Sequence, residues 1–194
     1  MKTNIILAGV GGQGILTIAA VIDTAALASN LNIKQSEVHG MSQRGGAVQS
    51  HLRISSKEIH SDLIPLGKAD IIISVEPMEL LRYIPYLKKD GLLVTDSNPF
   101  ENIANYPELK EIYSEIKSHQ NSILIDAKQI AKDLGNSKAT NMVLLGAAAS
   151  HLPLSDESLQ QAIQTLFERK GERIVAKNLE AFIKGKEIAT ETVS

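Results

Sequence analysis

The sequence NIILAGVGGQG, residues 4–14, joins a short apolar run to a turn that contains four glycines. The run from Asn4 to Ala8 predicts a buried strand, and the residues from about Gln13 to Ala28 predict a helix. A second strand is expected over Ile33 to Val38. A strand, a glycine turn and a helix in this order indicate the βαβ opening of an α/β domain.

The glycines of this turn have a spacing that is found at phosphate sites. Gly9, Gly11 and Gly14 fit the pattern G-x-G-x-x-G, which lets backbone N–H groups approach an anion at the positive end of a helix dipole. A dinucleotide site would also need an acidic residue at the end of the second strand, where Glu37 fits only loosely. The glycines could instead serve only to pack the first helix closely on the sheet, so both interpretations stay open. The candidate ligand-binding residues of this turn are Gly9, Gly11, Gly12, Gln13 and Gly14.

Further strands are expected along the chain. Ala47 to Ile54 alternates between two faces, and we expect it to form an antiparallel hairpin with residues near Glu58 to His60. Ala69 to Val75 is apolar almost throughout, which is typical of a parallel strand buried on both faces. Shorter buried strands are expected over Gly91 to Thr95 and over Ile123 to Ile125.

Helical patterns separate these strands. Pro77 opens one helix, and Asp126 is expected to cap another over Ala127 to Leu134. Two amphipathic surface helices end the pattern, and we expect the chain to fray after Lys186. The sequence therefore predicts one Rossmann-like, three-layer αβα domain over residues 1–194, with a mostly parallel sheet and an antiparallel hairpin.

One further helix is predicted to be buried. The residues from Met142 to Ala149 are small and apolar, and Thr140 or Asn141 would cap their start. Gly146 lies within this segment. Because glycine has no side chain, we expect a neighbouring element to approach the helix closely there.

Composition narrows the range of functions. Among 194 residues, 20 are basic and 22 acidic, with no long run of like charge, which argues against a nucleic-acid partner. No segment has the roughly 20 uninterrupted apolar residues that a membrane span needs, and glycines and Asp23 interrupt the apolar start in a way that a signal peptide does not. The absence of cysteine excludes disulfides and iron–sulfur clusters held by thiolates of this chain. A cytoplasmic location is expected.

A second loop places polar residues between glycines. It follows the strand that ends near Val38, and it is longer than a plain connection needs. Because open α/β sheets bind ligands at the carboxyl ends of their strands, we interpret it as a binding loop. Arg44 is expected to contact a phosphate group or an acidic partner surface. The candidates are Ser42, Gln43, Arg44, Gly45 and Gly46.

Glu76 is a further candidate, at the end of the strand before Pro77. The favoured interpretation is that its carboxylate meets the first N–H groups of the helix that Pro77 opens, and contact with a ligand is the alternative. The histidines have no metal-binding spacing, and no arrangement of serine, histidine and acid is recognisable. We therefore predict no catalytic and no metal-binding residue.

Six motifs spread over almost the whole chain carry a family resemblance. They are Ala8–Gly14, Met41–Gly46, Ser61–Pro65, Gly67–Asp70, Glu76–Tyr83 and Asn141–Gly146. With these motifs the chain resembles the small subunit of 2-oxoacid:ferredoxin oxidoreductases, which is called gamma in four-subunit enzymes. It looks more like the indolepyruvate branch, where the small subunit is called beta, than like the pyruvate, ketoisovalerate or ketoglutarate branches.

The resemblance implies an enzyme that converts a 2-oxoacid and coenzyme A into an acyl-CoA and carbon dioxide and passes two electrons to ferredoxin. It implies that thiamine diphosphate and the iron–sulfur clusters belong to a large partner subunit and that this chain is not active alone. It adds Asn141 to the candidate residues. The leading hypothesis is that the glycine-rich loops bind part of coenzyme A or close over the partner's thiamine site. An independent Rossmann-type nucleotide-binding enzyme and a purely structural scaffold subunit stay open as alternatives.

Overall fold

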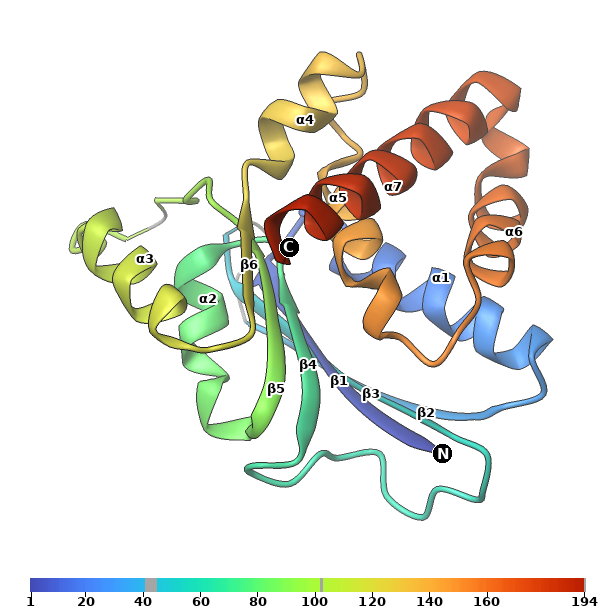
Figure 1. Ribbon diagram of the computed structural model, residues 1–194, viewed down its shortest axis with the longest axis horizontal. Helices are drawn as coiled ribbons and strands as arrows, with labels where there is room; N and C mark the ends of the chain where they lie inside the picture. The colour runs from blue at the N-terminus through green and yellow to red at the C-terminus, as the bar shows by residue number, and fades with distance from the viewer. Residues whose placement is uncertain (41–44, 102, 194) are drawn as a thin grey trace.

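The computed structural model describes residues 1–40, 45–101 and 103–193 (Figure 1). The strands are β1 (Lys2–Val10), β2 (Asn32–His39), β3 (Ala47–Ser55), β4 (Ala69–Ser74), β5 (Leu87–Asp96) and β6 (Ser122–Ile125). The helices are α1 (Ile15–Ala28), α2 (Pro77–Arg82), α3 (Leu109–Ser118), α4 (Ala127–Asp133), α5 (Thr140–Ala148), α6 (Asp156–Phe167) and α7 (Glu172–Val193). Short 3₁₀ turns lie at Ile84–Tyr86, Ala149–His151 and Glu168–Lys170.

The strands form one mixed sheet in the order β2-β3-β1-β4-β5-β6. β1, β4, β5 and β6 pair in parallel, whereas β3 is antiparallel to both of its neighbours, β1 and β2. Only β3 of these strands runs against the others. The predicted α/β fold with a mostly parallel sheet is therefore confirmed.

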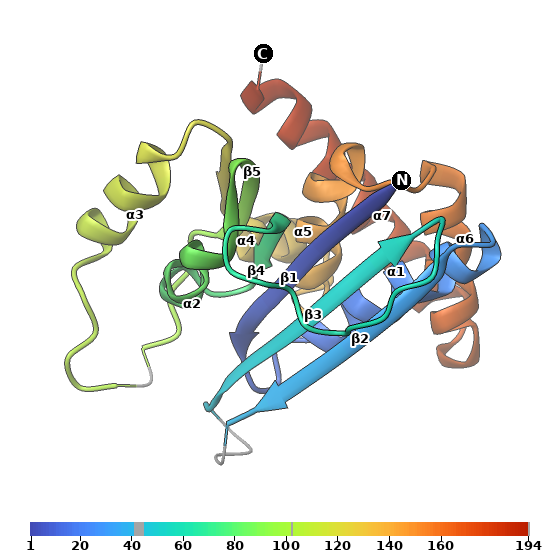
Figure 2. The same cartoon turned by 90° about the horizontal axis from the view of Figure 1, so that it is seen from below.

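The predicted partner of the alternating strand is wrong. β3 pairs with β2, where Ile54 lies opposite Ile33, and the residues near Glu58 to His60 form no strand. The segment 56–68 instead runs across the face of β3 and β1 (Figure 2). It is held there because the Nη1 atom of Arg53 donates to the carbonyl oxygens of Ser61 at 2.7 Å and Leu63 at 3.0 Å.

Helices cover both faces of the sheet, as a three-layer fold requires. Helices α1, α4, α5, α6 and α7 pack on one face, where Ile5 and Leu7 of β1 enter the larger hydrophobic core. Helices α2 and α3 pack on the other face, where Ile6 enters the smaller core. The continuous apolar sequences of β1 and β4 follow from this burial on both sides.

Helices α5 and α7 cross in close contact, which confirms the expectation for Gly146. A Cβ atom on Gly146 would lie 1.9 Å from the carbonyl oxygen of Phe182, and one on Gly185 would lie 1.9 Å from that of Val143. Each helix therefore supplies a glycine to the crossing. Since only glycine leaves this space, the two backbones touch directly.

Two smaller predictions about helix ends are wrong. Helix α5 has Ala139 at its N-cap with no side-chain hydrogen bond, so neither Thr140 nor Asn141 caps it. The chain does not fray after Lys186, because α7 continues and its Ala189 packs into the larger core. The predicted cap of α4 is confirmed, since Asp126 accepts a hydrogen bond from the N–H of Gln129 at 2.9 Å.

None of the helices in the described part of the chain combines the length and the hydrophobicity needed to cross a bilayer.

Candidate functional site

The first glycine turn lies at the carboxyl end of β1. Helix α1 begins at Ile15, later than predicted, and Gly14 is its N-cap with a left-handed backbone (φ 80°). Gln13 therefore does not open the helix. Its Oε1 atom accepts a hydrogen bond from the N–H of Val10 at 2.7 Å, which closes the turn. Glycine suits position 14 because other residues rarely adopt this backbone conformation.

Asn141 joins this turn to the start of α5. Its Nδ2 atom donates to the carbonyl oxygen of Gly14 at 3.1 Å, across 127 positions of sequence. A Cβ atom on Gly14 would lie only 2.6 Å from that Nδ2 atom. The fold thus brings together two candidates that the sequence predicted separately, and the glycine makes room for the contact.

The second glycine loop lies beside the first. The N–H of Gly11 donates to the carbonyl oxygen of Gly46 at 2.9 Å, and the N–H of Gly40 donates to Ala47 at 2.8 Å. The loop is the connection of the β2–β3 hairpin, so it has a structural role that the sequence did not reveal. Ser42, Gln43 and Arg44 lie outside the described residues, and their predicted contacts stay predictions.

An open cleft of about 810 Å³ lies at the carboxyl edge of the sheet. Gly12, Gln13, Gly14 and Asn141 line it, together with residues that follow β4 and β5 and residues of α7. It opens where the chain leaves β1 for one face of the sheet through α1 and leaves β4 for the other face through α2 (Figure 1). Ligands of open α/β sheets bind at such switch points.

The cleft has an excess of positive charge. Lys128, Lys138 and Lys170 line it, and Asp96 is the one carboxylate among its lining residues in the described part of the chain. Asp96 is buried and accepts hydrogen bonds from the N–H of Ala127 and from Asn98, both at 3.0 Å. Its pKa is raised by burial. These bonds hold the end of β5 to the start of α4, so the positive charge at the cleft comes from the three lysines.

Two helix N-termini add to this field. Helices α1 and α5 both begin at the cleft, and the first N–H groups of a helix have no partner within the helix. Ammonium groups and free N–H groups together favour a ligand with several negative oxygens, such as a phosphorylated molecule.

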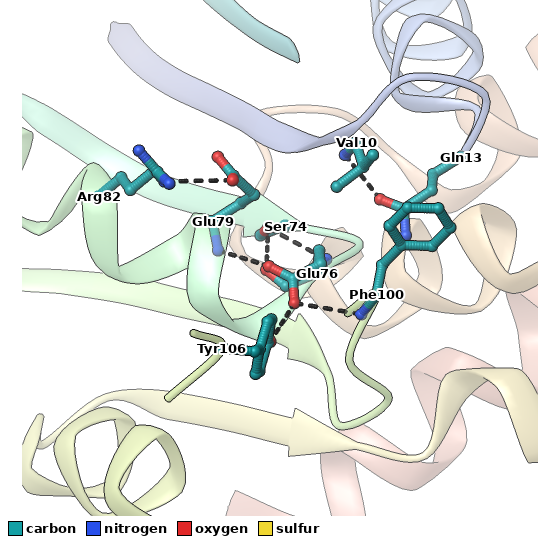
Figure 3. A network of polar contacts seen from close by, with 8 residues as sticks. All are labelled: Val10, Gln13, Ser74, Glu76, Glu79, Arg82, Phe100 and Tyr106. Carbon is teal, nitrogen blue, oxygen red and sulfur yellow. Dashed lines mark hydrogen bonds and ion pairs between the residues drawn. The ribbon is translucent and has the colours of Figure 1, made fainter. Parts of the chain in front are cut away.

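Glu76 is fully buried at the start of α2 (Figure 3). Its Oε2 atom accepts a hydrogen bond from the N–H of Glu79 at 2.6 Å, so the favoured interpretation, a cap on α2, is confirmed. Its Oε1 atom accepts from the hydroxyl of Tyr106 and, at 3.4 Å, from the N–H of Phe100. Ligand contact by Glu76 stays a prediction.

Sequence reasoning missed much of the cleft. The three lysines come from separate segments, and no local pattern marks them. Asn98, Pro99 and Phe100 also line the cleft, although the sequence around them resembles an ordinary turn. The signal that could have found this segment is its position directly after a buried parallel strand.

No group of three or more His, Asp or Glu side chains in the described residues could hold a metal ion.

Comparisons with known proteins agree on one family. The family model described as pyruvate ferredoxin/flavodoxin oxidoreductase matches residues 4–188. The indolepyruvate oxidoreductase subunit IorB of Pyrococcus horikoshii is 39% identical over 201 residues, which cover 98% of this chain and 98% of that protein. The 2-oxoglutarate synthase subunit KorC of Methanocaldococcus jannaschii is 29% identical and covers 98% and 96%.

Solved structures give the same result. The 2-oxoglutarate:ferredoxin oxidoreductase from Magnetococcus marinus, with 2-oxoglutarate, coenzyme A and succinyl-CoA bound, matches with a TM-score of 0.77 and 25% identity. The match covers 98% of this chain and 31% of that chain. The gamma subunit of a keto/oxoacid ferredoxin oxidoreductase from Geobacter sulfurreducens matches with a TM-score of 0.70 and 27% identity, over 97% and 99%.

Proposed function

We infer that this chain, which belongs to the pyruvate ferredoxin/flavodoxin oxidoreductase family, is the small subunit of an indolepyruvate-type 2-oxoacid:ferredoxin oxidoreductase. The observation that carries this proposal is the similarity to four IorB subunits, at 36% to 39% identity over nearly the whole of each chain. Similarity to the KorC subunits is lower, at 29% to 30%. The aryl-substituted 2-oxoacids are therefore the proposed substrates.

The redox centres of such an enzyme do not fit this chain. It contains no cysteine, so it cannot supply the thiolates that hold iron–sulfur clusters. We propose that a large partner subunit holds the clusters and thiamine diphosphate, and that ferredoxin accepts the electrons from that subunit. This chain then contributes binding surface rather than redox chemistry.

The cleft is the proposed site for coenzyme A. The molecule carries several phosphate oxygens, which match the three lysines and the helix N-termini at the cleft. Gly9, Gly11, Gly12, Gln13 and Gly14 build the turn that leads into the N-terminus of α1, and Asn141 fixes that turn to α5. These residues would hold the phosphates and so orient the thiol towards the partner's thiamine site.

The second glycine loop is proposed to extend this site. Gly45 and Gly46 lie next to the first turn through the bond between Gly46 and Gly11. Ser42, Gln43 and Arg44 precede Gly45 directly in the sequence, and their contribution to the site stays a prediction. Arg44 keeps its two predicted partners, a coenzyme A phosphate and an acidic surface of the large subunit.

The two alternatives are less well supported. An independent nucleotide-binding enzyme is not favoured, because the relatives are named as subunits over their full length. A scaffold without ligand contact would not need a basic cleft at the switch point. The single-domain organisation and the cytoplasmic location stay proposals.

The proposal is tested with the assembled enzyme. The tagged chain is co-expressed with its large partner subunit, and ferredoxin reduction is measured with indolepyruvate, pyruvate and 2-oxoglutarate in the presence of coenzyme A. We expect the specificity constant for indolepyruvate to exceed the other two by at least about tenfold, a difference of ~1.4 kcal/mol in transition-state binding. Turnover by the isolated chain, or preference for 2-oxoglutarate, would contradict it.

A matched pair of variants tests the cleft. Lys138 lines the cleft, whereas Lys57 is exposed on the 56–68 segment outside it. Lys138→Gln should raise the KM for coenzyme A, and Lys57→Gln should not. If the two variants have the same KM for coenzyme A, the proposal that coenzyme A binds in the cleft is wrong.

A further inference from the structure

We propose that Phe100 is an aromatic platform on which the purine ring of the cleft's ligand stacks, and that Glu76 positions this platform. The inference rests on the proposed function, because coenzyme A is the ligand that brings a purine to the cleft. Phe100 would determine specificity for the planar purine ring, whereas the lysines and the helix N-termini recognise only the negative charge of the ligand.

Phe100 has an unusual place for a phenylalanine in this chain. Only three phenylalanines are present, and Phe182 is buried in the core with 1% of its surface exposed. The other two, Phe100 and Phe167, both line the cleft. Phe167 is 7% exposed and already lies beneath the ammonium group of Lys170, 5.1 Å from its ring centre. Phe100 is 44% exposed, so it can offer its ring to a ligand.

Hydrogen bonds hold the backbone that leads to Phe100. Before it, Asn98 donates to Asp96 at 3.0 Å and to Asp126 at 2.7 Å, and the hydroxyl of Tyr113 donates to the carbonyl oxygen of Ser97. The N–H of Phe100 itself donates to Oε1 of Glu76 at 3.4 Å, and the hydroxyl of Tyr106 donates to the same oxygen. An exposed ring on a fixed backbone is preorganised, which reduces the entropy lost when a ligand binds.

Glu76 is fully buried, so its hydrogen bonds matter for the position of the platform. In the described part of the chain, three donors reach its carboxylate: the N–H of Glu79, the N–H of Phe100 and the hydroxyl of Tyr106 (Figure 3). Two of the three belong to the segment that carries the platform. A buried carboxylate that loses its hydrogen-bond donors costs free energy. Movement of this segment away from Glu76 would remove two of the donors, so the segment is held in place. Burial and Glu76 raise the pKa of Tyr106, which therefore stays a donor.

The cleft combines two kinds of surface that suit one ligand. Gly12, Gly14 and the lysines form a part that attracts phosphate, and Phe100 adds an apolar, flat surface in the same cavity of about 810 Å³. A phosphorylated purine nucleotide combines both features. Base–aromatic stacking is sequence-tolerant but specific for a planar ring, so the platform would distinguish coenzyme A from its pantetheine part.

The test compares two ligands on the assembled enzyme without 2-oxoacid. Calorimetry measures the Kd of coenzyme A and of 4′-phosphopantetheine, which lacks the purine. Phe100→Leu should weaken coenzyme A by about tenfold and leave phosphopantetheine unchanged, whereas Phe100→Tyr should keep wild-type affinity for both. The KM for coenzyme A should rise with its Kd.

The positioning role needs a separate variant, because Glu76 itself supports α2. Tyr106→Phe removes one hydroxyl and keeps the ring. It should weaken coenzyme A by about threefold to fivefold in wild-type background, and it should add nothing to Phe100→Leu, because both act through one platform. Independent, additive effects would overturn the positioning role of the Glu76 contacts.

Other outcomes separate this inference from the proposed function. If Phe100→Leu weakens both ligands equally or neither, while Lys138→Gln weakens both, the cleft binds coenzyme A but Phe100 is not its platform. If Phe100→Leu dissociates the complex in size-exclusion chromatography, Phe100 is a partner contact and the inference is wrong. If the wild-type enzyme binds neither ligand, the proposed coenzyme A site fails and this inference fails with it.

Discussion

The crossing of α5 and α7 gives the sharpest prediction about stability. Gly146→Ala places a methyl group 1.9 Å from the carbonyl oxygen of Phe182, whereas real Cβ atoms almost never approach closer than 3.0 Å. The contact is with backbone, so no flexible side chain can move aside. Helix α7 must shift away from α5 by about 1 Å or more, and the packing around it must follow.

The magnitude combines two opposing effects. Overpacking of a core costs typically about 1–3 kcal/mol, and a backbone clash belongs at the upper end. Alanine in place of glycine in a helix returns about 1 kcal/mol. We expect a net loss of about 2 kcal/mol in the free energy of unfolding. For a chain of this length that lowers the Tm by about 4–8 °C.

Urea unfolding of the small subunit, followed by circular dichroism, measures this loss. Gly185→Ala tests the same crossing from the other helix, because its Cβ would meet the carbonyl oxygen of Val143 at 1.9 Å. Gly135→Ala is the control: no atom lies within 4 Å of its added Cβ, and only the left-handed backbone (φ 69°) opposes it, at about 1 kcal/mol. If Gly146→Ala is as stable as the wild type or more stable, helix propensity outweighs the contact and the reasoning is refuted.

Three further predictions concern charge and the site. Burial, and then the charge of Glu37, raise the pKa of Asp23 from 3.8 to about 6. The folded chain therefore binds this proton more tightly than the unfolded chain does. The free energy of unfolding should fall as the pH rises from about 4 to 6. Asp23→Asn should remove this slope in urea midpoints measured across that range. Lys138→Gln should raise the KM for coenzyme A by about fivefold to tenfold at low salt and by less in high salt, because added ions screen an exposed charge. Asn141→Ala should cost about 1–2 kcal/mol in thermal unfolding, since the carbonyl oxygen of Gly14 loses its donor; an unchanged Tm would show that water replaces the amide.

The strands that bury both faces could be predicted from sequence, but their neighbours could not. The apolar run of β4 is typical of a central strand buried on both faces, and the structure agrees. The alternation of β3 was also correct, yet it says which face is buried and not which strand lies beside it. Arg53 and His51 belong to the polar side of that alternation, and both are buried, at 7% and 5% exposure, because the 56–68 segment covers them. Burial by such a loop does not appear in the sequence pattern of the strand itself.

The candidate site also has one part that the sequence reveals and another part that only the fold brings together. The glycine turn is recognisable because its spacing is local, and its place at the end of β1 follows from the strand before it. Lys128, Lys138 and Lys170 line one cleft only because the fold brings α4, the loop before α5 and the 3₁₀ turn after α6 to one edge of the sheet. A single lysine on a surface carries no information in sequence. Helix α3 was missed for a related reason, since Ile112 and Ile116 are its only buried residues and give one helical repeat.

The two ends of the described chain lie apart from the cleft. β1 starts at the sheet edge opposite the glycine turn, and α7 passes the cleft at Ile174 and Asn178 before it runs on to Val193 (Figure 2). Both ends of the described chain therefore lie away from the carboxyl edge of the sheet. In the Magnetococcus marinus enzyme the matching region is 31% of a longer chain. A match of this length inside a longer chain shows that the same fold occurs as part of a larger polypeptide, and in the present fold the points at which the chain enters and leaves are separate from the residues that line the cleft.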